Sequence, residues 1–270
     1  MATIKAFFKK EMIEAKRQYK YIIIASGLIA FAILDPIMLK LLPKIFEKQI
    51  PLELTNLFDI SAESALSNYI KNLFQIGSMF IIFTVSNTLN EEIYSQKLVF
   101  PYSAGANLKG IVFAKALHYI LSICLFLLIG LLTAYYYIGI LFDSGSIRIN
   151  HIFNIWILIS TFYIFIISFS IFLSSLTKKG ITAGFISLTI VFSSSILANV
   201  KFVGDFVPYK LIQISYTFSL NNSLKPILFT FLLSLLLILI TTKVNDRDGL
   251  RCSPNSIQFG YGKFISFFIN

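Results

Sequence analysis

The sequence predicts an all-α membrane protein with six transmembrane helices, an N-terminal amphipathic helix at the membrane surface, and both termini in the cytoplasm. Three observations support this prediction. The chain is 56% hydrophobic and only 13% charged, whereas soluble domains average about 25% charged residues. Several apolar runs reach the roughly 20 residues that a helix needs to cross a bilayer. Basic residues cluster at the ends of these runs, as the positive-inside rule expects.

Residues 1–20 are expected to form the amphipathic helix. Its apolar residues recur at helical spacing, and basic residues occupy the other faces. The apolar set is Ile4, Phe7, Phe8, Met12 and Ala15. A basic helix with phenylalanines on its apolar side suits the plane of a membrane surface, so we expect contact with lipid.

The transmembrane domain is expected over residues 21–242, followed by a cytoplasmic tail over residues 243–270. The six spans are expected at residues 21–42, 70–88, 113–137, 152–176, 181–200 and 226–242. With the N-terminus inside, most of the 23 Lys and Arg residues fall on the cytoplasmic side. A multi-pass protein of a bacterial plasma membrane is the expected location.

The first span contains Asp35 followed by Pro36. A carboxylate inside a membrane is by default a candidate functional group. However, Asp is also a good N-cap and Pro a good first helical residue. We favour this second interpretation, in which one helix ends at Leu34 and another begins at Pro36 and leads to the outer surface.

The polar loop of residues 90–115 is the largest inward feature between spans. It combines two adjacent carboxylates, a group of apolar residues, a turn and a basic helix start. These residues are Glu91, Glu92, Leu98, Phe100, Pro101, Tyr102, Ser103, Lys109 and Lys115. Apolar area in an otherwise polar loop indicates an interface with another protein, although burial against the membrane surface would also satisfy it.

The residues do not predict an enzyme. His118 and His151 fall on opposite sides of the membrane in this topology, so they cannot share a metal ion. Residues 105–110 have the glycine spacing of a phosphate loop, but Ile111 and Val112 stand where Lys and Ser or Thr must bind phosphate and Mg²⁺. The pair at residues 91–92 lacks the following arginine of paired-glutamate intramembrane proteases. We therefore expect no catalytic residue, metal or cofactor in this chain.

The energy source is expected in another protein. The second to sixth spans carry no paired ionisable residues of the kind that ion-coupled transporters use. The net charge of +10 is concentrated at the ends of apolar runs, which argues for membrane headgroups and against a nucleic-acid partner. Gly180 and Gly184, at the start of the fifth span, form a small-xxx-small pair and are expected to pack closely against another helix.

The basic leader, the six spans and the inner loop together resemble the permease subunit of a type-2 ABC exporter. The matching loop positions are Glu91, Glu92, Leu98, Pro101, Ser103 and Lys115. In that family, this loop holds a coupling helix that docks on a cytoplasmic ATPase. The resemblance implies a separate ATPase that binds ATP and Mg²⁺, and a second permease subunit, identical or related. A non-transporting membrane protein, such as an immunity or sensor subunit, is the alternative.

Overall fold

The structure is a computed structural model that describes residues 2–46, 61–95, 97–142, 147–177, 179–200, 204–221 and 223–249. Every regular element within these ranges is helical, which confirms the predicted all-α class. Six helical segments are long and apolar enough to cross a membrane, so the chain is a multi-pass membrane protein. The end of the predicted tail, residues 250–270, lies outside the described residues.

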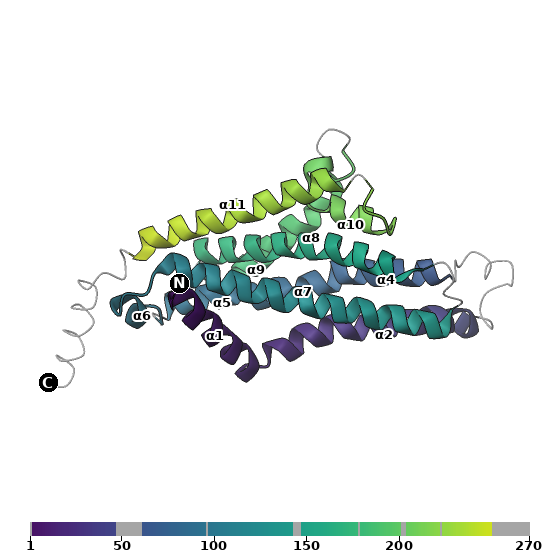
Figure 1. Ribbon diagram of the computed structural model, residues 1–270, viewed down its shortest axis with the longest axis horizontal. Coiled ribbons are helices and arrows are strands. Elements are labelled where there is room, and N and C mark those ends of the chain that lie inside the picture. Colours follow the sequence, from purple (N-terminus) through teal and green to yellow (C-terminus); the bar gives the residue numbers. More distant parts are fainter. Residues whose placement is uncertain are drawn as a thin grey trace, which may run out of the picture.

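The elements follow one another as an antiparallel bundle along the longest axis (Figure 1). The first half contains α1 (Ala2–Arg17), α2 (Lys20–Phe46), α4 (Ala62–Asn72), the π turn η1 (Leu73–Gly77), α5 (Ser78–Tyr94) and α6 (Val99–Ser103). The second half contains α7 (Leu108–Leu141), α8 (Ile149–Leu176), α9 (Gly180–Leu197), the 3₁₀ turn η3 (Gly204–Phe206), α10 (Lys210–Ser215) and α11 (Leu224–Gly249). Elements α1 and α6 and the last turns of α11 share one end of the bundle, and α10 and the start of α4 lie at the other.

The six spans lie close to the predicted positions, with one difference. The second span begins at Ala62 and runs through α4, η1 and α5 to Ile93, whereas the sequence predicts its start at residue 70. Ser61 begins it with a capping box, because its hydroxyl accepts the Ser64 N–H and Ser64 Oγ accepts the Ser61 N–H. The polar residues of α4 therefore belong to the same continuous helix.

The predicted break at Asp35 is wrong, because α2 continues unbroken from Lys20 to Phe46. Pro36 has no N–H, so the Ala32 carbonyl loses one helical hydrogen bond. A complete break would leave up to four N–H and four C=O groups without helical partners on the two sides. Inside a bilayer no water can replace those bonds, so losing one of them costs less than ending the helix.

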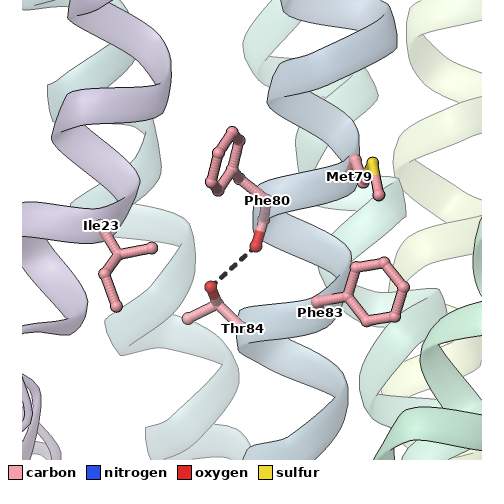
Figure 2. Close-up of a pocket in the computed structure, with 5 residues that line it drawn as sticks. All are labelled: Ile23, Met79, Phe80, Phe83 and Thr84. Carbon is pink, nitrogen blue, oxygen red and sulfur yellow. Dashed lines mark hydrogen bonds between the residues drawn. The ribbon is translucent and has the colours of Figure 1, made fainter.

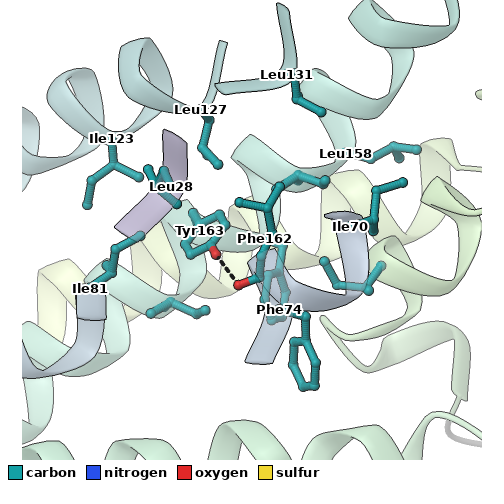
Figure 3. Close-up of a cluster of buried hydrophobic side chains, with 14 of the residues drawn as sticks. Leu28, Ile70, Phe74, Ile81, Ile123, Leu127, Leu131, Leu158, Phe162 and Tyr163 are labelled. Atoms are coloured by element: carbon teal, nitrogen blue, oxygen red, sulfur yellow. Dashed lines mark hydrogen bonds between the residues drawn. The ribbon is translucent and has the colours of Figure 1, made fainter. Parts of the chain in front are cut away.

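Helix α8 forms the centre of the bundle. In the most apolar 18-residue stretch of α8, 72% of the residues are buried, against 28% in the corresponding stretch of α9. Figure 3 shows the core around it, in which Leu28 of α2, Phe74 of η1 and Leu127 of α7 converge on Phe162 and Tyr163 of α8. Both α9 and α11 also carry apolar side chains that face outward, as expected for helices that contact lipid: Ile181, Phe185 and Ile190 on α9, and Leu228 and Leu232 on α11.

The π turn is held by a tyrosine from α8. The Leu73 carbonyl accepts the Ser78 N–H and also the Tyr163 hydroxyl at 2.7 Å, the bond drawn dashed in Figure 3. Gly77 makes room for that hydroxyl, because a Cβ there would lie 2.7 Å from it. Tyr69 acts similarly one turn earlier, donating to the Leu28 carbonyl at 3.0 Å. These hydroxyls satisfy backbone oxygens that water cannot reach.

Candidate functional site

The predicted docking loop contains a short helix, α6, between the ends of α5 and α7. Two local features place it. Gly105 has φ +83°, a left-handed conformation that glycine adopts without strain, and it turns the chain after α6. Asn107 then caps α7, since its side chain accepts the Lys109 N–H at 3.0 Å. As a result, α6 projects from the same end of the bundle as α1 (Figure 1).

Several predicted loop residues are exposed. The Phe100 side chain is 80% exposed. Glu91 is also exposed and forms an ion pair with Lys97 at 2.6 Å, and this hydrogen-bonded carboxylate raises the pKa of the Lys97 ammonium. Ser103 is exposed, and its hydroxyl donates to the Phe100 carbonyl at 2.8 Å. The loop therefore exposes an apolar ring, a hydroxyl group and an ion pair.

Other predicted loop residues point into the protein. Leu98 is 9% exposed and Glu92 only 3%, and Pro101 is half-buried. Tyr102 lies in α6, and its side chain falls outside the described part of the chain. The structure thus separates the two adjacent glutamates: Glu91 faces solvent, and Glu92 belongs to a different arrangement.

Glu92 is a member of a group of six charged residues, called here the charge cluster: Lys10, Glu11, Glu14, Lys20, Glu92 and Lys115. The Lys115 ammonium is 1% exposed and lies 2.8 Å from Glu11 Oε1 and 3.2 Å from Glu92 Oε2. Lys10 contacts Glu92 directly and lies 3.1 Å from Glu11. The cluster joins α1 to the end of α5 and the start of α7, which are the two stems of the predicted docking loop.

The electrostatics of the cluster favour the ionised forms of Glu11 and Glu14. Burial is the largest influence on the Glu11 carboxyl and would raise its pKa, but Lys115 and Lys10 together lower that pKa below the usual value. Burial likewise opposes ionisation of Glu14, yet Lys10 and Lys20 lower the pKa of this carboxyl to about 2. The carboxylate oxygens of Glu11, Glu14 and Glu92 lie within 4.8 Å of one another, a spacing that could hold a metal ion. Three lysines already balance these three charges.

The burial of Glu11 in an ion pair was not predicted from the sequence. A signal was present, because Glu11 shares helical register with Ile4, Phe8 and Ala15 on the expected apolar face of α1. In the structure Glu11 and Ala15 are buried, whereas Met12 is 48% exposed. A charged residue within an apolar stripe indicates a buried partner of opposite charge.

A histidine contact adds to the attachment of α1. His118 of α7 is 2% exposed, and its Nε2 lies 2.6 Å from the Tyr21 hydroxyl of α2. Phe8 of α1 packs edge-on against the same imidazole, with ring centroids 5.8 Å apart. Helices α1, α2 and α7 therefore meet at one residue next to the charge cluster.

The two predicted packing glycines lie against α5 of the same chain. A Cβ on Gly180 would lie 2.3 Å from Asn87 Oδ1 and 2.7 Å from Asn87 Cα. A Cβ on Gly184 would lie 2.8 Å from the Phe83 ring. Both positions let α9 approach α5 more closely than any larger residue would allow.

An open groove of about 370 Å³ lies between α2 and α5 (Figure 2). The groove is lined by Ile23 of α2 and by Met79, Phe80, Phe83 and Thr84 of α5. The Thr84 hydroxyl already donates to the Phe80 carbonyl at 2.7 Å. The groove therefore offers mainly apolar contact area.

In comparisons with protein-family models and with curated proteins, nothing matches this chain.

Proposed function

We propose that this protein is the permease subunit of an ATP-driven ABC transporter of the exporter type, located in a bacterial plasma membrane. A separate cytoplasmic ATPase, which binds ATP and Mg²⁺, would dock on the loop of residues 91–103. The observation that carries the proposal is the exposed Phe100 on α6, between the ends of two spans. Its end of the bundle, shared with α1 and the C-terminal turns of α11, is assigned to the cytoplasm.

The exposed loop has the chemistry of a protein-binding surface. Burying a phenylalanine side chain contributes about 1.5–3 kcal/mol. Glu91 and Ser103 are exposed in the same loop and would supply polar contacts to a partner. Aromatic anchors with a polar surround are typical of the residues that dominate binding energy.

The charge cluster provides a route from the loop to the bundle. It pairs residues of both loop stems with α1, so a force on α6 would reach three helices together. ATP can bias the conformation only if the ATPase binds the loop differently in two states. A second permease subunit, identical or related, would complete the transport path, and the apolar groove between α2 and α5 is a surface suited to such helix contact.

Phe100→Asp tests the docking surface directly. The protein would be purified together with an ABC ATPase from the same organism, and both complex affinity and transport in proteoliposomes would be measured. We expect a loss of about 10- to 100-fold in ATPase affinity, the equivalent of the burial energy above. Leu224→Asp is the matched control, since Leu224 is 73% exposed at the first position of α11, at the opposite end of the bundle.

Two results would contradict the proposal. Equal ATPase affinity of the Phe100→Asp and Leu224→Asp proteins would remove α6 as the docking element. Failure of the unaltered chain to bind any ATPase would favour the non-transporting alternative, an immunity or sensor protein. To test the acidic pair in this assay, Glu91→Gln is the appropriate variant, because altering Glu92 would also disturb the charge cluster.

A further inference from the structure

Asp35 is a carboxylate inside the first span whose position no helix end explains. It lies seven residues before Leu42, the end of the apolar span, and therefore about 10 Å from that end. Because α2 continues through this position, the side chain caps no helix. Its Oδ1 accepts the Asn72 amide of α4 at 2.8 Å, while its Oδ2 is buried without any hydrogen-bond partner.

Among the described residues, no cation pairs with this carboxylate. Lys40, on its own helix, instead donates to the Leu141 carbonyl of α7. Lys71, on α4, is exposed and forms no ion pair with Asp35, and Glu63, on the same helix, is itself an exposed acid. Tyr69, the third titratable residue of α4, donates its hydroxyl to the Leu28 carbonyl.

We propose that Asp35 is a proton-binding site, and that its carboxyl group is neutral in the folded protein at neutral pH. An unpaired ionised carboxylate in a bilayer is costly, and a buried group without a counter-charge neutralises instead. The one fixed hydrogen bond, from Asn72, is available to either protonation state, so it does not require a charge.

The adjacent proline supplies an acceptor for the proton. Pro36 lacks an N–H, so the Ala32 carbonyl has no helical donor from that position. Side chains in helices donate readily to carbonyls three or four residues earlier, and Ser26 and Thr88 do so here to the residues three positions before them. A carboxylic O–H on Asp35 would satisfy the Ala32 oxygen in the same way.

The bound proton links two helices to pH. Proton release would place a negative charge at the contact between α2 and α4, next to the π turn that begins at Leu73. The site thus reports the proton concentration at the end of the bundle opposite α6. It is independent of ATPase docking, and its test needs no partner protein.

The test is infrared spectroscopy of the full chain labelled with ¹³C-aspartate in detergent at neutral pH. We expect a C=O stretch of a protonated aspartic acid in the unaltered protein and its loss in Asp35→Asn. Asp205→Asn is the matched control, because Asp205 is exposed in η3, and this variant should keep the band. Should Asp35→Asn fail to fold, Asp35→Glu keeps an acid at the site but moves it to an unlabelled residue, so the labelled band should again disappear.

Absence of a protonated band in the unaltered protein at neutral pH would overturn the proposal. Persistence of the band in both Asp35→Asn and Asp35→Glu would do the same, because the proton would then belong to another aspartate.

Discussion

Replacing Lys115 with methionine would remove the cation that two buried carboxylates share. Methionine approximates the length of the lysine stem, so the change removes mainly the charge. Glu11 and Glu92 are 2% and 3% exposed, and neither can turn to water without disrupting the contact between α1 and the loop stems. The expected result is a large loss of stability of the folded protein.

The magnitude follows from the geometry. At 2.8 and 3.2 Å, the two attractions amount to about 6 and about 5 kcal/mol at an effective dielectric constant of about 20, before any desolvation cost. Removing one partner of a buried pair typically costs about 3–5 kcal/mol net. Because Lys10 remains close to both carboxylates, we expect a cost near the lower value, about 3 kcal/mol.

The assay is reversible unfolding in mixed micelles with increasing SDS, followed by circular dichroism. Lys109→Met is the control, since Lys109 is an exposed lysine near the start of the same helix, and surface changes usually stay within about 0.5 kcal/mol. Adding Glu11→Gln to the Lys115→Met protein should restore at least about 1 kcal/mol, because one uncompensated charge disappears. If Lys115→Met and Lys109→Met unfold at the same SDS fraction, the charge cluster does not stabilise the fold.

Two further predictions use the same unfolding assay. Gly180→Ala should destabilise the protein by about 1–3 kcal/mol, the usual cost of overpacking, because the alanine Cβ would collide with the Asn87 backbone. Thr182→Ala, at an exposed position of the same helix, is the control. Equal stability of the two variants would refute close packing of α5 against α9. Stability should also fall as the pH drops from about 4.5 to about 2, because the pKa of Glu14 is lowered in the folded protein. The ionised carboxylate stabilises the fold at pH values above its unfolded pKa. This stabilisation is lost as the pH falls and the carboxyl of the folded protein becomes protonated. Glu14→Gln should make this acid-dependent loss smaller, and an unchanged profile would contradict the pairing of Glu14 with Lys10.

The positions of the spans could be predicted because the length of an apolar run is a local property of the sequence. The fourth span illustrates this, with residues 152–176 predicted and Ile149–Leu176 observed. The start of the second span was less evident, since Glu63 and Ser64 interrupt the apolar run, although the helix buries Leu66 and Tyr69 on its other face. Whether the predicted N-terminal helix lies at a membrane surface stays a prediction.

The charge cluster could not be predicted from local patterns. Lys115 and Glu11 are 104 residues apart, and Lys10 and Glu92 are 82 apart. Nothing in the loop sequence distinguishes Glu91 from Glu92. The two side chains point to different sides of the same helix, and the sequence does not say which side meets the rest of the protein. Only the packing of α1 across both loop stems determines which glutamate is buried.

The π turn accounts for an unusual rhythm in the second span. One set of its buried positions recurs every four residues: Leu66, Ile70, Phe74, Ser78, Ile82, Ser86 and Asn90. An α-helix rotates by about 100° per residue, so a four-residue repeat drifts sideways by about 40° at each step. A π turn accommodates one residue more than an α turn and so cancels roughly 100° of that drift. Leu73–Gly77 thereby corrects part of the drift, at the point where the span passes from α4, which packs against α2 and α7, to α5, which packs against α8 and α9.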